Sequence, residues 1–317
     1  MAIRRQPLRS SFVSTFRTCP RRALLGATER STSKKSHYMA GGQAAAILTD
    51  HFHKGLEVPA DPYVAAASAL QVAMQTGEYA VNSEENQLII KRLGEAFGNY
   101  RSWFAESGFS VIASEIELRH PGKGANEFAG KIDLLAEKDG KIYLLDIKTH
   151  GLCGKSVSPP KMVHMERDFQ VCFYSVLVED GCKAYLGDVP REMNNAEVER
   201  SYRSIDLKIK PDFVGFIELA WLTSYLRGSK DGKKKAGDLR GDPLFVAEFT
   251  ESRKDYALEV ARAVTTAIQL NQFPRYSAFS RGQYTCDSCE FKNACWNEQV
   301  HTVGAKPAWM RGNTAND

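Results

Sequence analysis

Residues Gly130–Thr149, GKIDLLAEKDGKIYLLDIKT, form two apolar, strand-like runs on either side of the dipeptide Asp139-Gly140. Asp-Gly between two such runs is the strongest short-range sequence pattern for a hairpin with a two-residue turn. Pairing the two strands outward from that turn places Asp133 directly opposite Asp146. The sequence therefore predicts a hairpin that brings two carboxylates together.

Two opposed aspartates need a partner of positive charge. Side chains directly opposite each other lie about 4.5–5.5 Å apart at Cβ, and like charges there are destabilising. Carboxylate oxygens suit Mg²⁺ or Mn²⁺, which lower the pKa of a bound water and stabilise a phosphate under attack. Lys148 shares the face of Asp146, while Leu145 and Ile147 point to the other side, into an expected core. The alternative is a surface hairpin with exposed ion pairs.

Three short motifs follow one another along the chain: Gly130-x2-Asp133, Asp146-Ile147-Lys148 and Gln170-x3-Tyr174. In this order and spacing they resemble the RecB-like nuclease domain of the PD-(D/E)XK superfamily. The resemblance implies an α/β, restriction-endonuclease-like core, with a mixed sheet flanked by helices, that hydrolyses DNA. It also implies that Asp133, Asp146 and the Ile147 carbonyl bind metal and that Lys148 is catalytic. Gln170 and Tyr174 share a helix face, as residues four apart do, and together would address a nucleotide.

The strand before the hairpin carries two acids. Period-two alternation over Phe109–Leu118 places Glu115 and Glu117 on one face. Glu115 matches an acidic position of the family, which implies a metal ligand, direct or through water, and Glu117 is its rival. The alternative is that both acids face solvent.

Three cysteines near the carboxyl end, Cys286-x2-Cys289-x5-Cys295, predict a metal-binding knuckle, because thiolates at such short spacing rarely serve packing. A fourth ligand is required, and spacing leaves open zinc or an iron–sulfur cluster. The candidates for that ligand are Cys19, His301, Cys153, Cys172 and Cys182.

The segment Ser14–Arg21, STFRTCPR, resembles the amino-terminal cysteine segment of iron–sulfur RecB-like nucleases, including AddB and the CRISPR-associated exonucleases. The resemblance implies that Cys19 joins the three carboxyl-terminal cysteines in a 4Fe-4S cluster that ties the chain ends together. Zinc at the same thiolates is the alternative. Cys153, Cys172 and Cys182 are then simple buried thiols.

The resemblance is incomplete in one helix. A Gly-x3-His motif in this family often supplies a ligating imidazole, but the matching segment here runs from Gly42 to Ala46. His51 lies about 140° around the helix from position 46 and is no obvious substitute. Gln43, Asp50 or water would complete the coordination.

The pattern along the chain divides it into residues 1–40, with the first cluster cysteine; 41–280, the RecB-like nuclease core; 281–300, the cysteine segment; and 301–317, a flexible tail. The basic stretch Arg227–Arg240 is a solvated loop or, alternatively, a DNA contact. Apolar periodicity predicts helices near Gly41–Lys54, Ser83–Phe104, Asp168–Glu179, Phe213–Leu226 and Glu248–Leu270, and strands near Phe109–Leu118, Gly130–Lys138, Lys141–Thr149, Lys183–Leu186 and Ser204–Ile209.

The composition predicts a soluble protein. The 317 residues carry a net charge of +4, and no apolar run is long enough to span a membrane. The basic first 35 residues imitate an organellar transit peptide. The competing interpretation, that Ser11–Arg22 belongs to the fold, favours the cytoplasm of a bacterial or phage-infected cell.

Three functions remain on these grounds. The leading one is a DNA exonuclease that acts on single-stranded or free-ended DNA in recombination, repair or phage replication, with a helicase or recombination protein as a possible partner. The second is a catalytically weakened nuclease fold that grips DNA or a helicase. The third is a zinc-knuckle adaptor for nucleic acid.

Overall fold

The computed structural model describes residues 7–28, 35–76, 79–80, 82–121, 127–150, 152, 168–187, 189, 193–224 and 241–270. Its centre is an eight-stranded mixed sheet in the order β10-β9-β6-β5-β4-β7-β8, with β1 beside β5. The strands are β1 (Leu8–Arg9), β4 (Ser110–His120), β5 (Phe128–Lys138), β6 (Lys141–Lys148), β7 (Cys182–Tyr185), β8 (Ser204–Leu207), β9 (Phe213–Glu218) and β10 (Leu244–Glu248). A separate pair joins β2 (Lys35–Ser36) to β3 (Tyr79–Ala80).

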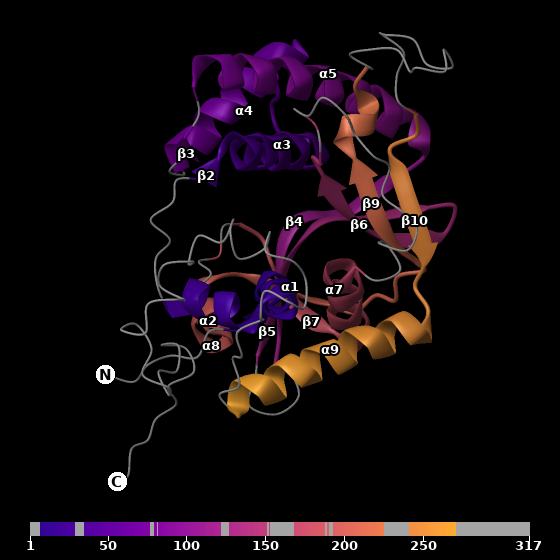
Figure 1. The fold of residues 1–317 in the computed structure, drawn as a ribbon. Helices are drawn as coiled ribbons and strands as arrows, with labels where there is room; N and C mark the ends of the chain where they lie inside the picture. The colour runs from indigo at the N-terminus through magenta and orange to yellow at the C-terminus, as the bar shows by residue number, and fades with distance from the viewer. Residues whose placement is uncertain are drawn as a thin grey trace, which may run out of the picture.

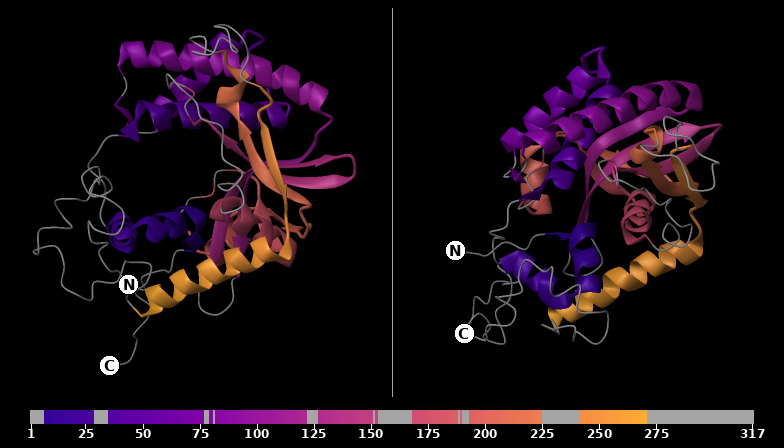
Figure 2. Two further views of the ribbon diagram at one scale, coloured as in Figure 1. Left: turned by 45° about the vertical axis from the view of Figure 1, so that its right-hand side comes forward. Right: turned by 45° about the horizontal axis from the view of Figure 1, so that its top comes forward.

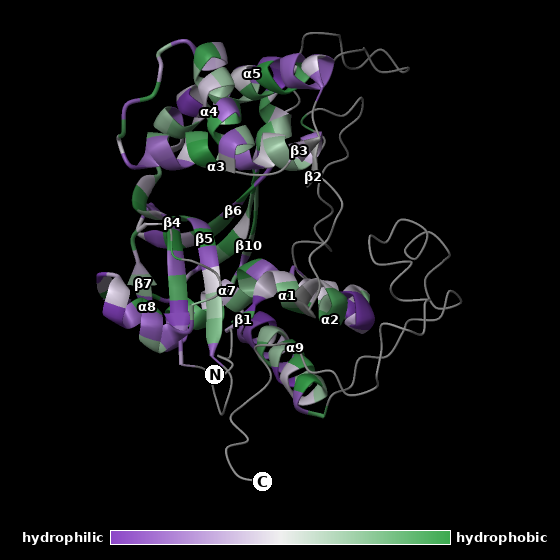
Figure 3. Ribbon diagram, turned by 90° about the vertical axis from the view of Figure 1, so that its left-hand side faces the viewer, coloured by the Kyte–Doolittle hydropathy of each residue, from purple (hydrophilic) through white to green (hydrophobic). Residues whose placement is uncertain are grey.

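Helices pack on both sides of this sheet, which confirms the expected α/β core. In Figures 1 and 2, α3, α4 and α5 form one layer, and α7 and α9 lie on the other side of the central strands. Figure 3 shows hydrophobic and hydrophilic residues along the same helices, as expected for elements with one buried face. The helices are α1 (Ser10–Thr18), α2 (Pro20–Thr28), α3 (His37–His53), α4 (Pro62–Thr76), α5 (Ser83–Ser107), α7 (Phe169–Asp180), α8 (Asn195–Ser201) and α9 (Glu251–Gln269).

Successive residues of the central strands enter two different cores. Leu144 of β6 packs into the core with α7 and α9, whereas Leu145 packs into the core with α3, α4 and α5. Asp146 and Lys148 therefore belong to the face that looks toward α7, because side chains alternate along a strand.

The predicted hairpin is confirmed at its turn and in its register. Lys138 pairs with Lys141 across the turn, and the antiparallel ladder continues to Leu134 and Leu145. Asp139 and Gly140 have φ values of 53° and 70°. Positive φ at both turn residues is what a type I′ hairpin requires.

One predicted helix is wrong. The stretch expected as a helix around Phe213–Leu226 forms β9 and a 3₁₀ turn, Leu219–Leu222. β9 pairs in parallel with β6 and is buried on both faces, so its apolar residues run on without alternation. A short continuous apolar run of this kind cannot be told from a buried helix by periodicity. Strand β10, which pairs with β9 and precedes α9, was also not predicted from the sequence.

Helix α4 was not predicted either, although its start is marked in the sequence. The Asp61 carboxylate accepts hydrogen bonds from the backbone N–H groups of Tyr63 and Val64, and Pro62 opens the helix. An aspartate followed by proline is a typical helix start. This pair would have revealed the helix.

The amino-terminal helices pack into the core, as the fold interpretation of Ser11–Arg22 predicted. Val13 of α1 and Leu24 of α2 are buried in the cluster that contains α7 and α9. Among the described helices, none is both long enough and apolar enough to cross a membrane. The basic stretch Arg227–Arg240 and the tail 301–317 lie outside the described residues.

A buried arginine joins helix α5 to two chain segments near the sheet. Arg92 is 1% exposed and pairs with Glu95 at 2.8 Å. Its guanidinium donates to the Leu152 carbonyl at 3.3 Å, the Thr223 hydroxyl at 2.7 Å and the Ser224 carbonyl at 3.2 Å. One side chain thus fixes the turn after β6 and the segment after β9.

Replacing Arg92 with methionine is expected to lower the free energy of unfolding by about 2–3 kcal/mol, because buried acceptors and a charge lose their donor. Urea unfolding measures this loss. Arg101→Met is the matched control on the same helix, since the hydrogen bond that Arg101 makes within the described residues is an exposed one, to the Ala60 carbonyl. Equal, small effects of the two substitutions would contradict the role given to Arg92.

Candidate active site

Three acids form a row across three adjacent strands. Glu115 of β4 lies between the residues that pair with Leu134 and Ile132, and so lies opposite Asp133 of β5. Asp133 and Asp146 occupy facing positions one step beyond the last β5–β6 pair. The register predicted from the turn therefore holds up to the carboxylates.

The β5–β6 ladder ends where the aspartates begin. The Asp133 Oδ2 atom accepts a hydrogen bond from the Ile147 backbone N–H at 2.8 Å. Beyond this point β6 remains paired with β9 as far as Lys148 and Glu218. The Asp133 carboxylate thus takes the place of a backbone carbonyl of β5 as the acceptor for the Ile147 N–H. This hydrogen bond holds the carboxylate beside β6.

Asp146 is held by two side chains on its own face of the sheet. The Lys148 Nζ atom lies 2.5 Å from Oδ2 of Asp146, and the Gln170 amide donates to Oδ1 at 2.7 Å. Lys148 also donates to the Gln170 Oε1 atom at 3.4 Å. Asp168 caps α7 by accepting from the backbone N–H of Gln170, which fixes the start of that helix. Asp146, Lys148 and Gln170 are therefore one connected cluster.

Burial and mutual repulsion act on the two aspartates. Burial raises the pKa of Asp133, and the charges of Asp146 and Glu115 raise it further. Burial also raises the pKa of Asp146, although Lys148 opposes that effect. Burial alone would lower the pKa of Lys148, but the Asp146 carboxylate outweighs it and the pKa rises. Without a cation, the row holds more negative charge than its surroundings stabilise.

The acids of β4 do not face solvent, so that alternative is wrong. Glu115 has a 10% exposed side chain that pairs with Lys131 at 2.6 Å. Glu117 is 5% exposed and pairs with Arg9 at 2.6 Å and Arg119 at 2.8 Å. Two arginines neutralise Glu117, which lies opposite Lys131 in the strand register. Glu115 lies opposite Asp133, so it is the acid of β4 that belongs to the carboxylate row.

The backbone at Glu115 departs from simple alternation. Its φ is +49°, in the left-handed region that non-glycine residues rarely adopt, and the β4–β5 register shifts between Val111 and Ala113. Such a conformation costs about 1–3 kcal/mol and persists only where the surroundings enforce it. Strain of this kind, next to a carboxylate pair, is typical of functional sites.

Tyr174 connects the hairpin to the amino-terminal helix. A Cβ built on Gly130 would lie 2.2 Å from Cε1 of Tyr174, so only glycine fits beneath this ring. The Tyr174 hydroxyl lies 2.7 Å from the hydroxyl of Ser10, and both residues are buried. Gln170 thus reaches the aspartates, while Tyr174, one turn later, packs on β5 and α1. No sequence pattern indicated a role for Ser10.

Residues 10–296 match the PD-(D/E)XK nuclease superfamily, and this span includes every residue of the carboxylate row and of the Lys148 cluster. The chain belongs to the PD-(D/E)XK nuclease superfamily. Membership implies a metal-dependent nuclease, and enzymes of this superfamily typically use Mg²⁺ or Mn²⁺. No curated protein sequence matches the chain.

The donors of this PD-(D/E)XK site fit a hard divalent cation. Two carboxylates with raised pKa values face each other, and a cation would neutralise both. Within the described part of the chain, no three His, Cys, Asp or Glu side chains come together as a preformed metal site. The geometry therefore supplies two facing carboxylates, with Glu115 beside them, rather than a closed cage.

Helix α3 provides no imidazole to the carboxylate row among its described residues. Ala46 occupies the expected histidine position, and His51 is exposed. His53 is turned toward α5, where its Nε2 atom lies 2.8 Å from the Tyr100 hydroxyl. Asp50 comes nearer: its carboxylate accepts from the Ser114 hydroxyl at 3.3 Å and pairs with Lys54.

The described cysteines differ in burial. Cys172 and Cys182 are buried free thiols, as expected, and burial raises the pKa of each to about 12. Cys19 ends α1 and is half-buried. Cys153, Cys286, Cys289, Cys295 and His301 lie outside the described residues.

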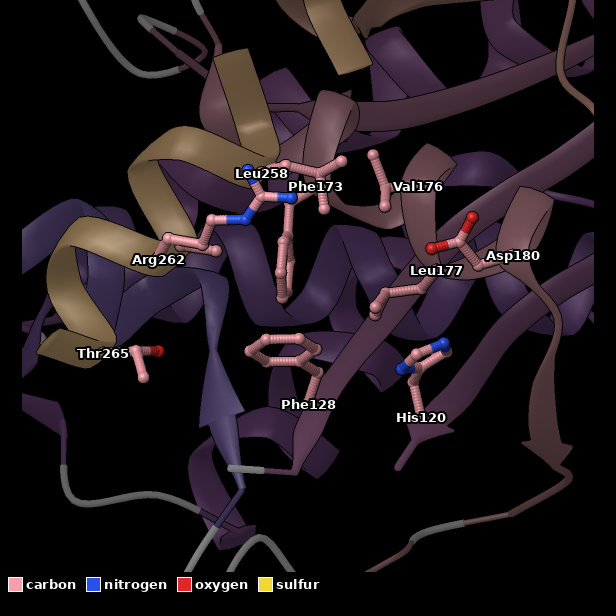
Figure 4. A pocket seen from close by; sticks show the side chains of 10 residues that line it. His120, Phe128, Phe173, Val176, Leu177, Asp180, Leu258, Arg262 and Thr265 are labelled. Carbon is pink, nitrogen blue, oxygen red and sulfur yellow. The ribbon is translucent and has the colours of Figure 1, made fainter. Parts of the chain in front are cut away.

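A separate pocket opens between the sheet end and helices α7 and α9. Figure 4 shows Phe128 and Phe173 inside it, and their ring centroids lie 5.4 Å apart. Arg262 and Thr265 approach from α9. None of the residues that line this pocket belongs to the carboxylate row, so it is distinct from the candidate active site.

Replacing Asp133 with asparagine is expected to stabilise the metal-free protein at pH 7. The folded pKa of Asp133 lies above the unfolded value, so stability is lost as pH rises from the unfolded to the folded pKa. Asparagine removes that penalty and keeps an oxygen for the Ile147 N–H. We expect a gain of about 1 kcal/mol or more, seen as a few degrees in Tm that shrink toward pH 4.

Asp212→Asn is the matched control, because the Asp212 carboxylate accepts from the Ile142 N–H and its pKa is lowered. It is expected not to stabilise the protein. Added Mn²⁺ should raise the Tm of the wild type and leave that of Asp133→Asn unchanged. A wild type that melts above Asp133→Asn without metal would contradict the predicted sign.

Proposed function

We propose that this superfamily member is a DNA nuclease, acting as an exonuclease on single-stranded or free-ended DNA. The observation that carries the proposal is the cluster of Asp146, Lys148 and Gln170, joined by contacts of 2.5 and 2.7 Å. Asp133 is held beside this cluster by the Ile147 backbone N–H at 2.8 Å. Two facing carboxylates beside an ammonium group suit hydrolysis of a phosphodiester. The reaction would serve DNA recombination, repair or phage replication, in the cytoplasm and alongside a helicase or recombination protein.

The proposed roles follow from the positions of the side chains. Asp133, Asp146 and the Ile147 carbonyl would hold Mg²⁺ or Mn²⁺, with Glu115 bound directly or through water. The ion would supply Lewis-acid stabilisation of the attacked phosphate. Lys148 would orient the attacking water.

The two residues of α7 are proposed as further parts of the active site. Gln170 keeps Asp146 and Lys148 in place through its amide, and its position at the edge of the cluster suits contact with a nucleotide. Tyr174 would support β5, the strand that carries Asp133, through its packing on Gly130. This supporting role agrees with the buried hydroxyl of Tyr174.

We also propose that Cys19, Cys286, Cys289 and Cys295 bind a 4Fe-4S cluster, with Zn²⁺ as the alternative metal. The half-buried position of Cys19, between two helices that pack on the core, suits a structural role. Iron and zinc analysis together with the visible absorption spectrum separates the two metals. Stoichiometric zinc without iron would exclude the cluster.

Digestion of end-labelled single- and double-stranded DNA with Mg²⁺, Mn²⁺ or EDTA tests the nuclease proposal. We expect cutting with either ion, none with EDTA, and release of short products from a labelled end. Circular DNA is the control that separates an exonuclease from an endonuclease. Efficient cutting of the circle, or cutting in EDTA, would contradict the proposal.

A second candidate is a catalytically weakened module that grips DNA or a helicase. The observation in its favour is Ala46, which leaves α3 without the imidazole that relatives often supply. The intact cluster around Lys148 opposes it. DNA binding without metal-dependent cutting would favour this second function.

A further inference from the structure

A histidine and a glutamate meet beside Lys148, and the proposed chemistry does not yet use them. Glu218 ends β9 and is the register partner of Lys148 on the neighbouring strand, so both side chains project from the same face. The His150 Nδ1 atom lies 3.6 Å from the Glu218 Oε1 atom. His150 is two residues beyond Lys148. The pair thus lies at the end of the catalytic strand.

The burial of the two side chains is unequal. Glu218 is 5% exposed, while His150 is 78% exposed. The second carboxylate oxygen of Glu218, Oε2, is buried and has no hydrogen-bond partner among the described residues. An ordinary surface ion pair has two solvated partners and contributes little. Burial of a carboxylate with so few partners is costly, which points to a specific role for its contact with His150.

The chain around His150 is fixed. The Leu152 N–H donates to the Thr149 carbonyl, which closes a turn across His150, and Leu152 is buried. The Leu152 carbonyl in turn accepts from Arg92. Glu218 is held as well, because its backbone N–H donates to the Pro243 carbonyl at 2.9 Å. Both members of the pair are therefore positioned by the fold, with the imidazole edge left toward solvent.

The contact between Glu218 and His150 is the arrangement expected for a histidine that acts as a positioned proton donor. When a carboxylate contacts Nδ1 of a histidine, it fixes the tautomer and leaves Nε2 to face the substrate. The contact with Glu218 raises the pKa of His150 against the effect of partial burial, with Asp146 adding to the rise and Lys148 opposing it. The protonated imidazole is thereby favoured.

We propose that His150, oriented by Glu218, is the general acid that protonates the leaving oxygen during phosphodiester hydrolysis; this rests on the proposed nuclease function. Water attacks phosphorus on the Lys148 side and releases a proton to bulk solvent. The bond from phosphorus to the leaving sugar oxygen breaks, and its electron pair goes to that oxygen. The oxygen takes the Nε2 proton, and solvent returns a proton to the imidazole. His150 lies in the turn two residues beyond Lys148, so the ammonium group and the imidazole come from one short stretch of chain at the end of β6.

A substrate whose leaving group needs no proton tests this directly. Oligonucleotides with one bridging sulfur, at the 3′ or the 5′ position of the scissile phosphate, release a thiolate in place of an alkoxide. His150→Gln is expected to lower the rate of cutting of the all-oxygen substrate roughly 100-fold, since general acids contribute 10²–10⁴-fold to the rate. On the substrate with sulfur at the leaving position the loss should fall below about tenfold.

Glu218→Gln tests the positioning role. This variant should lower the rate of cutting less than His150→Gln does, with the same dependence on the leaving group. In a His150→Gln background it should lower the rate no further, because Glu218 acts through the imidazole. His51→Gln, at the exposed histidine of α3, is the matched control and should leave both substrates unaffected.

The outcomes separate two failures. If the wild type does not cut DNA, the nuclease function is wrong and the general acid with it. If the wild type cuts and His150→Gln loses the same factor on oxygen and sulfur substrates, or loses nothing, the general acid is wrong and the nuclease stands.

Discussion

Lys148→Ala is expected to lower the rate of DNA cutting by about 10²–10⁴-fold, the range observed when a group that assists proton transfer is removed. The ammonium group lies 2.5 Å from Asp146 and donates to Gln170, so it lies within reach of a water held at the carboxylates. DNA binding should change little. Gel-based digestion with Mn²⁺, under single-turnover conditions, gives the rate, and fluorescence anisotropy with Ca²⁺ gives the affinity.

Lys183→Ala is the control for Lys148→Ala, because Lys183 pairs with Asp206 at the exposed edge between β7 and β8. It should cut at the wild-type rate. Metal-dependent cutting that survives Lys148→Ala would refute the role assigned to this lysine.

Gly130→Ala is expected to destabilise the protein by about 1–3 kcal/mol, as overpacking of a filled core does, and to reduce cutting strongly. The new methyl group would lie 2.2 Å from Cε1 and 2.7 Å from Cδ1 of Tyr174. The ring has little freedom to move, since it is buried and its hydroxyl is held by Ser10. The strain would instead shift β5, which carries Asp133 three residues later. Thermal unfolding and the digestion assay measure both effects.

A double substitution shows whether Tyr174 is the obstacle. Gly130→Ala combined with Tyr174→Leu should be less destabilised than the sum of the single changes, because the ring that clashes is gone. Gly41→Ala is the control: its methyl would lie 3.6 Å from Ile89, an ordinary van der Waals contact between α3 and α5. Additive effects of the two changes at 130 and 174 would contradict the proposed clash.

The centre of the site was predictable because its geometry is local. The Asp139-Gly140 turn fixes the register of the hairpin, and the register alone places Asp133 opposite Asp146 and Lys148 on the same face. The Gln170 spacing on α7 followed from helix periodicity. These inferences require only a short stretch of chain and the fixed repeats of strands and helices.

The other features of the site could not be predicted, because they depend on contacts between segments that are distant in the sequence. Glu218 lay in a run that was interpreted as helix, so its position beside Lys148 could not be anticipated. Ser10 reaches Tyr174 from 164 positions away in the sequence, and no local pattern indicates such a bond. The left-handed backbone conformation of Glu115 was also not predicted, because period-two alternation assumes a regular strand. Tertiary packing, rather than propensity, determines all three.

The strain at Glu115 has a consequence for protein engineering. Glycine at this position would relax a backbone held at φ +49°, and selection for heat resistance alone should therefore favour Glu115→Gly. The same change would remove the acid that faces Asp133. Selection for thermal stability without an activity screen would therefore favour a variant that is more stable but lacks this acid. Such a selection should combine heating with a nuclease assay.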